Sequence, residues 1–236
     1  MSGHSKWSTI KRQKEANDSK RGQMFSKIAR AITLAARTGP NPDTNLQLRA
    51  LVEKARQYNM PKDNIGRAIS RADGAGGKTI ENVVYEGYGP GGVAIIVEAV
   101  TDNKNRTAQE VKNIFERGGG SLGTPGSVSF QFQHAGQIFV EKKKNPEEQA
   151  LEIIDLGVED VEIVEDGIEV HTKPDDLFKT KEKIEQAGMA IKSAELVFKP
   201  KILVPTSDST SGQQALRLLE NLDEHDDVQR VYANMG

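Results

Sequence analysis

Apolar residues recur at helical spacing through the first third of the chain and predict three short helices. Residues 23–38 place apolar side chains on one side and basic side chains on the other, and Gly39-Pro40 ends the segment. Residues 41–44 offer caps for a second helix, and Pro61 suits the first turn of a third. Small residues dominate the apolar stripes, so we expect a helical domain with a thin core.

After a glycine-rich linker at 73–77, the pattern changes from helical to strand-like. Residues 83–88 and 93–100 flank a Gly-Pro-Gly-Gly sequence, which predicts a β-hairpin with a four-residue loop. Asn105 can cap a helix that ends at three consecutive glycines. The alternation of Val128, Phe130 and Phe132 with polar residues then predicts a half-buried strand.

A third unit follows, in which strand and helix patterns alternate in the order β-α-β-β-α-β. Its central hairpin is indicated by Asp166-Gly167, a strong hairpin signal between strands at 161–164 and 168–171. The predicted elements are a strand at 137–141, a helix at 146–156, these two strands, a helix at 175–187 and a strand at 191–198. This order is typical of a ferredoxin-like split βαβ unit.

The C-terminal elements, a helix at 211–222 and a strand at 228–232, cannot form a stable unit alone. We therefore expect the C-terminus to complete the middle domain. The predicted fold class is α+β with three domains, a helical N-terminal domain and two α/β domains. Their boundaries are 1–78, 79–133 with 201–236, and an inserted ferredoxin-like domain at 134–200.

The charge of the chain is strongly divided between its two parts. Residues 1–78 hold 16 basic and 6 acidic residues, a net charge of +10, whereas residues 79–236 hold 16 and 28, a net charge of -12. Such asymmetry points to a nucleic-acid or membrane partner. No apolar run is long enough to span a bilayer and there is no cysteine, so we expect a cytoplasmic protein without a membrane partner.

The first 37 residues carry nine basic residues against two acids, with no apolar period before Met24. Such a segment suits a polyanion, because each cation can neutralise a phosphate and release a counterion. Trp7 looks exposed and could stack on a base. The simplest alternative is a solvated arm without a partner. We assign nucleic-acid contacts to Lys6, Trp7, Lys11, Arg12, Lys14, Lys20, Arg21, Lys27, Arg30, Lys104 and Arg106.

A ten-residue loop at 118–127 is dense in glycine. Its backbone could approach a phosphate or RNA closely, while a plain helix-to-strand connection is the alternative. We assign contacts of this loop to Gly119, Gly120, Ser121, Gly123 and Gly126. The polar stretch at 101–107 can cap a helix through Asp102, Asn103 or Asn105, and Lys104 and Arg106 could also meet a polyanion there.

No constellation in the sequence predicts catalysis. Gly76-Gly77-Lys78-Thr79 lacks the preceding glycine and strand of a P-loop, because position 72 is alanine in a predicted helix. The acids around His225 match no metal-ligand spacing, and no nucleophile elbow is present. We predict no catalytic residue, no metal, no cofactor and no small-molecule substrate, and we expect a monomer.

Several blocks together resemble the YebC/PmpR family, and the match runs from the first residues to the last strand. Two positions depart from the family pattern: Ser121 stands where Asn is associated with the glycine loop, and Pro125 where a polar residue is commoner. The matching blocks are Gly3-His4-Ser5-Lys6-Trp7, Lys20-Arg21-Gly22, Pro61-Lys62-Asp63-Asn64-Ile65, Tyr85-Glu86-Gly87-Tyr88-Gly89-Pro90-Gly91-Gly92, Thr101-Asp102-Asn103-Lys104-Asn105-Arg106-Thr107 and Gly119-Gly120-Ser121-Leu122-Gly123.

The resemblance implies a three-domain, crescent-like architecture and nucleic-acid binding without catalysis. Its members are known as probable DNA-binding transcriptional regulators, and relatives act in translation at the ribosome on proline-rich stretches. The expected partner is therefore DNA or ribosomal RNA, with the ribosome as the alternative target. No recognition helix or zinc finger is evident, which favours binding by charge and shape. A protein-interaction adaptor with an incidental basic arm is the second hypothesis, and an enzyme the third.

Overall fold

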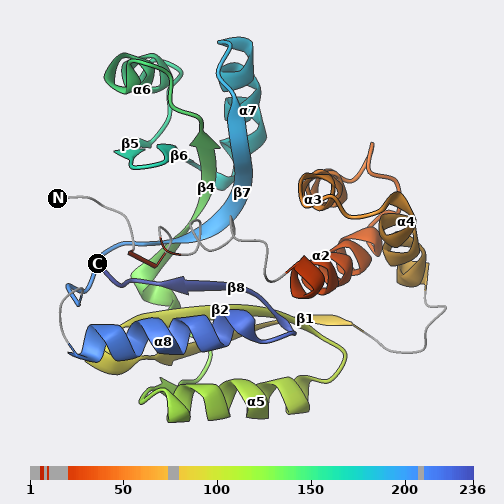
Figure 1. Cartoon of the computed structure of the whole chain (residues 1–236), viewed down its shortest axis with the longest axis vertical. Helices are drawn as coiled ribbons and strands as arrows, with labels where there is room; N and C mark the ends of the chain where they lie inside the picture. Colours follow the sequence, from red (N-terminus) through yellow and green to blue (C-terminus); the bar gives the residue numbers. More distant parts are fainter. Residues whose placement is uncertain (1–5, 8–9, 11–20, 74–79, 207–209) are drawn as a thin grey trace. The chain divides into compact units, whose positions relative to one another are not determined.

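The computed structural model describes residues 6–7, 10, 21–73, 80–206 and 210–236 (Figure 1). Helices and antiparallel sheets are both present, which confirms the α+β class. The described residues divide into two compact units: an inserted unit of residues 130–203, and a main unit of the described residues up to 129 together with those of 204–236. The separation of residues 1–78 as a domain of their own stays a prediction. None of the described helices is long and apolar enough to cross a bilayer.

The N-terminal part of the main unit consists of α2 (Arg21–Ala36), α3 (Leu46–Gln57) and α4 (Lys62–Ser70). Asn45 caps α3 by accepting a hydrogen bond from the Leu48 amide, one position beyond the predicted caps, and Pro61 is the N-cap of α4 and not part of its first turn. The Thr33 hydroxyl of α2 donates to the Ala68 carbonyl of α4 at 2.8 Å. The three helices enclose a core of small and aliphatic residues, as their stripes predict.

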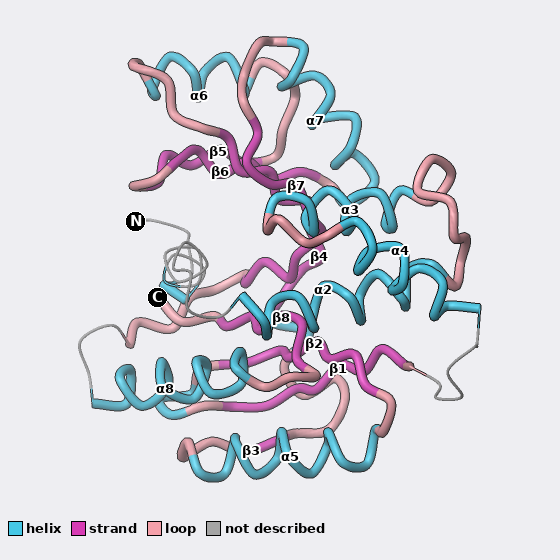
Figure 2. The backbone as a smooth tube through the Cα atoms, turned by 45° about the vertical axis from the view of Figure 1, so that its right-hand side comes forward, coloured by secondary structure: helices cyan, strands magenta, loops and turns pink. Residues whose placement is uncertain are grey.

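The rest of the main unit is a sheet in the order β3-β1-β2-β8, with α5 (Lys104–Arg117) and α8 (Thr210–Glu224) on one face (Figure 2). The strands are β1 (Glu81–Tyr88), β2 (Ala94–Thr101), β3 (Ser121–Leu122) and β8 (Val228–Ala233). The C-terminal strand β8 pairs antiparallel with β2, so that Val231 lies opposite Val97. Apolar residues of both helices and of the strands form one continuous core.

Of the three caps that the sequence offers at the start of α5, the structure uses Asn103, which accepts a hydrogen bond from the Arg106 amide at 3.1 Å. One local prediction is wrong. The strand expected at 128–132 is replaced by a 3₁₀ turn at Ser129–Gln131, and β4 begins only at Phe132. Val128 and Phe132 are buried as expected, but Phe130 is 65% exposed because the turn rotates it out of the alternation.

The inserted unit is ferredoxin-like, as predicted. Its sheet has the order β5-β6-β4-β7, and α6 (Pro146–Ile154) and α7 (Leu177–Gln186) cover one face (Figure 2). The strands are β4 (Phe132–Val140), β5 (Asp160–Val164), β6 (Gly167–Thr172) and β7 (Ile191–Pro200). All pairings are antiparallel, and the two central strands are β6 and β4. This arrangement matches the split βαβ order in the sequence.

Candidate nucleic-acid interface

The basic arm that the sequence singles out is only partly described. Lys11, Arg12, Lys14 and Lys20 lie outside the described residues, as does the side chain of Arg21, the first residue of α2. Lys6 is half-buried, and its backbone N–H donates to the Met235 carbonyl at 2.9 Å. The nucleic-acid contacts assigned to these residues stay predictions.

Trp7 is buried, which corrects the expectation that it is exposed. Only 2% of its surface is accessible, and it packs in the core of the main unit. Its indole Nε1–H donates to the carbonyl of Val231 on the edge strand β8 at 2.9 Å. A tryptophan so placed cannot stack on a base without leaving the core, so the stacking role is wrong for this structure.

Two cations of α2 bind the end of α8 and the acidic loop that follows it, within the main unit. The Lys27 ammonium donates to the Asp223 carbonyl, and Lys27 is only 9% exposed. The Arg30 guanidinium donates to the Asp226 carbonyl and to Oδ1 of Asp227, both at 2.6 Å. Both side chains therefore join α2 to the C-terminal part of the chain and are not free phosphate ligands.

Asp227 is the centre of this network. It is 3% exposed, and its Oδ2 accepts hydrogen bonds from the Thr107 hydroxyl at 2.7 Å, Arg106 Nη2 at 2.7 Å and the Thr101 hydroxyl at 3.1 Å. Burial by itself raises the pKa of this carboxyl, but the bonds from Thr107 and Arg106 and the charge of Arg30 outweigh it and lower the pKa. Asp227 is thus ionised and held by two arginines.

The two cations predicted beside the strand end also have internal partners. Lys104 pairs with Glu81. Arg106 pairs with Asp227 at 2.7 Å, Asp102 at 3.2 Å and Glu110 at 3.8 Å. The stretch at 101–107 therefore caps α5 and fixes Asp227, while its contact with nucleic acid stays a prediction.

Glu110, His225 and Asp227 bring ligand-type atoms within 4.8 Å of one another. His225 Nδ1 accepts a hydrogen bond from the Asp227 amide at 3.1 Å, so its Nε2 carries the proton and faces Glu110 at 2.9 Å. Both ring nitrogens are thus engaged, and Arg106 lies against the carboxylates. These donors form a hydrogen-bond and ion-pair network and do not suit a cation site.

The glycine loop is organised by a carboxylate of its own sheet. Glu86 on β1 is 8% exposed, and its two oxygens accept the N–H groups of Gly126, Val128 and Ser129, each at 2.8 Å. Burial by itself raises the pKa of Glu86, but these three backbone bonds and the Ser129 hydroxyl lower it below its usual value. The amides that could cradle a phosphate therefore already bind an internal anion.

The backbone conformation and the close packing of this loop require glycine at several positions. Gly119 and Gly126 have φ values of +75° and +88°, which side-chain-bearing residues rarely adopt. A Cβ on Gly120 would lie 2.5 Å from the Tyr88 carbonyl, so the chain passes too close to β1 for any other residue. Gly119, Ser121, Gly123 and Gly126 are exposed, and the contacts assigned to them stay a prediction.

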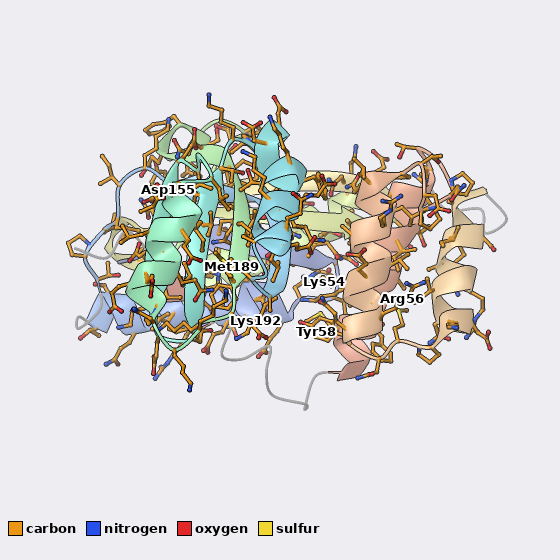
Figure 3. The ribbon with its side chains drawn as sticks, turned by 90° about the horizontal axis from the view of Figure 1, so that it is seen from above. Lys54, Arg56, Tyr58, Asp155, Met189 and Lys192 are labelled. Atoms are coloured by element: carbon orange, nitrogen blue, oxygen red, sulfur yellow. The ribbon has the colours of Figure 1, made fainter. Side chains whose placement is uncertain are left out.

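Several cations on α3 and around α4 were missed by the sequence assignments; Arg56 of α3 is exposed, whereas Lys54 is half-buried. Lys54 and Arg56 lie on opposite sides of α3, and Tyr58, its C-cap, lies on the side of Lys54 (Figure 3). Neither Lys54 nor Arg56 forms an ion pair with another described residue. Further exposed cations are Arg49, Lys62, Arg67 and Arg71, of which Arg49 has Asp43 3.9 Å away. The sequence feature that could have identified these cations is the net charge of +10 over residues 1–78, because this charge extends well beyond the arm.

Comparison with known proteins covers almost the whole chain. Residues 5–75 match the domain described as TACO1/YebC protein N-terminal domain, and residues 80–235 match the TACO1/YebC second and third domain. A protein of Thermomicrobium roseum is 51% identical over 238 residues, covering 99% of this chain and 96% of the relative. One of Dictyoglomus thermophilum is 48% identical over 238 residues, covering 99% and 95%. Both carry the name "Probable transcriptional regulatory protein".

A solved structure is also similar to this chain. The crystal structure of a conserved hypothetical protein, Aq1575 from Aquifex aeolicus, has a TM-score of 0.86 and 44% sequence identity. The likeness covers 93% of this chain and 91% of that chain. The fold described above therefore has an experimental counterpart over nearly its full length.

Proposed function

Because the chain belongs to the TACO1/YebC family, whose curated relatives are named probable transcriptional regulatory proteins, we propose that it is a regulatory protein that binds nucleic acid without catalysing a reaction. The binding surface is the basic N-terminal part of the main unit. The inserted unit and the acidic C-terminal elements orient that part or contact other proteins. The protein acts in the cytoplasm.

The observation that carries the proposal is a set of solvent-accessible cations without carboxylate partners. The exposed Arg56 and the half-buried Lys54 on α3, and the exposed Arg71 after α4, form no ion pair with another described residue. Lys27, Arg30 and Arg106, in contrast, are held by the end of α8 and the loop that follows it. Unpaired cations on rigid helices can neutralise phosphates and release counterions. We further propose phosphate contacts for the arm cations Lys11, Arg12, Lys14, Lys20 and Arg21.

The relatives' names favour a role in transcription, for which DNA is the expected target. One structural observation favours the alternative, a ribosome-associated translation factor that binds ribosomal RNA and relieves stalling on proline-rich stretches. A groove between α2 and α4 has a volume of about 410 Å³. Such a volume suits one unpaired base better than a duplex, which hides its bases.

The test is crosslinking of the intact protein in cells, followed by sequencing of DNA and RNA from the same sample. The variant replaces Lys11, Arg12, Lys20 and Arg21 by alanine. Deletion of residues 1–22 is unsuitable, because it removes Trp7 from the core. The matched control replaces four exposed lysines of the inserted unit by alanine: Lys142, Lys143, Lys144 and Lys179.

We expect the variant with four alanine substitutions in the arm to lose most of the recovered nucleic acid, and the control variant to retain it. Discrete promoter DNA would establish a transcriptional regulator, and dominant ribosomal RNA a translation factor. Recovery that is low for the wild-type protein, or equal for both variants, would contradict the proposal.

A further inference from the structure

A groove between α2 and α4 in the main unit combines an apolar floor with a basic rim. Its floor is formed by Phe25 and Ala29 of α2, Met60 just before α4, Ala68 within α4, and Ile80 just before β1. Met60 and Ala68 are buried, while Phe25 is half-buried and offers part of its ring to the groove. The bond from the Thr33 hydroxyl to the Ala68 carbonyl, 2.8 Å long, holds the two helices together at this floor.

The charge of the groove has one sign. Three arginines, Arg30, Arg67 and Arg71, line it, and no carboxylate is among the described residues that line it. Arg30 is paired with Asp227, but the Arg67 side chain donates to two neutral oxygens, the Asp63 carbonyl and the Asn64 amide oxygen. The Arg71 side chain has no hydrogen bond or ion pair with any other residue that the structure describes. Two guanidinium groups are therefore open to a phosphate, which they can bind with paired N–H donors.

An apolar floor beside open arginines selects a ligand that is flat and apolar on one side and anionic on the other. We propose that this groove binds one unpaired nucleotide of a single-stranded nucleic acid, with the base against Phe25 and Met60 and the adjacent phosphates on Arg67 and Arg71. The groove volume of about 410 Å³ lies in the range of small-molecule sites. A duplex cannot enter in this way, because its bases are stacked and paired. The inference rests on the proposed nucleic-acid-binding function and adds where the nucleic acid binds and that it is single-stranded.

The test is fluorescence anisotropy of a labelled 12-nucleotide oligouridylate and of a labelled DNA duplex, each titrated with the full-length protein. The groove variant is Arg67→Gln with Arg71→Gln. The matched control is Arg49→Gln with Arg56→Gln, which removes the same charge from two exposed positions of α3 outside the groove. A second groove variant, Phe25→Leu, removes the ring without changing charge, and thermal unfolding verifies the fold of each variant.

We expect the groove variant to weaken single-strand binding and to lower the slope of log K against log salt by about 1.4, which is roughly 0.7 for each phosphate that is no longer neutralised. The matched control should weaken it less. Phe25→Leu should weaken single-strand binding by about tenfold, the size of one base-stacking interaction, with an unchanged salt slope. Duplex binding should be unaffected by Phe25→Leu.

Three results would overturn the inference. Equal losses for the groove and control variants would show general electrostatic binding with no role for the groove, and the proposed function would stand. Uridine monophosphate competing as strongly as the oligonucleotide would indicate a free nucleotide as the ligand. Absence of any binding by the wild-type protein to either probe would remove the proposed function together with the groove site.

Discussion

At the residue scale, we expect substitution of the buried Asp227 to have the largest effect on stability. Replacing it by asparagine keeps the shape but removes the charge that Arg30 and Arg106 face. We expect Asp227→Asn to lower the free energy of unfolding by about 2–3 kcal/mol at pH 7, because charge-assisted hydrogen bonds to a buried group are lost. Urea unfolding measures this. The neighbouring Asp226→Asn, at an exposed side chain, is the control and should change stability by less than about 0.5 kcal/mol.

The same residue gives a pH dependence whose sign follows from its pKa. The pKa of Asp227 is lower in the folded protein than the value of about 3.9 in an unfolded chain. Its stabilisation is therefore complete above about pH 5 and is lost as the pH falls from about 4 through the folded pKa. The stability difference between wild type and Asp227→Asn should shrink over this range. A difference that stays constant down to about pH 3 would show that the folded protein does not favour the ionised form.

Trp7, the single tryptophan of the chain, reports on its own burial. We expect its fluorescence to be blue-shifted in the native protein and to shift to the red on unfolding, because the indole lies in the core. Addition of nucleic acid should leave the emission nearly unchanged. A red-shifted native emission that is strongly quenched by an oligonucleotide would restore the stacking role that the sequence suggested.

Trp7 and the paired cations show which properties of single residues the sequence alone could not predict. The pattern identified the basic arm as unusual, but it could not show that Trp7 returns to Val231 on β8, which is 224 positions away, since nothing local to the arm requires it. It also treated Lys27, Arg30 and Arg106 as free cations. Their distant partners lie at the end of α8 and in the acidic loop that follows it, and such long-range contacts leave no periodic signal in the sequence.

At the element scale, the connection from α5 to β4 depends on one buried carboxylate. Glu86→Gln replaces an acceptor for three backbone N–H groups with an amide whose NH₂ cannot accept. We expect a loss of about 2–3 kcal/mol in the free energy of unfolding. The amides of Gly126, Val128 and Ser129 should also lose hydrogen-exchange protection. The exposed Glu116→Gln on α5 is the control; equal effects of the two substitutions would contradict the anchoring role of Glu86.

Element order was predictable because it rests on local patterns. The hairpin signal at Asp166-Gly167 and the alternation of strand and helix periods sufficed to predict the ferredoxin-like unit, whose strand order the structure confirms. The turn itself lies one position earlier, at Glu165-Asp166, and Gly167 already pairs with Val164 as the first residue of β6. The error at Phe130 shows where such patterns fail: alternating residues can belong to a 3₁₀ turn when the backbone of that turn is fixed from outside, here by Glu86. The glycine loop was recognised as unusual, but its internal anion was not.

At the scale of the whole molecule, basic residues are concentrated in the N-terminal part of the sequence and acidic residues in the rest. The fold brings some residues of the two groups into contact. Asp227 pairs with Arg30 of α2, and the Asp223 carbonyl at the end of α8 accepts a hydrogen bond from Lys27. The remaining cations of α3 and α4 keep the N-terminal part basic. The total charge of +10 over residues 1–78 predicted the partner class, but only the structure shows which of the described cations have carboxylate partners.

The salt dependence of binding tests the central proposal most directly. The dissociation constant for a DNA duplex and for a single-stranded RNA is measured from low to high salt for the wild type and the alanine variant of Lys11, Arg12, Lys20 and Arg21. Each phosphate that the variant no longer neutralises should reduce the slope of log K against log salt by about 0.7–0.9, so four substitutions reduce it by about 3. The variant of the four inserted-unit lysines should keep the wild-type slope. An unchanged slope in the arm variant would contradict phosphate binding by the N-terminal part.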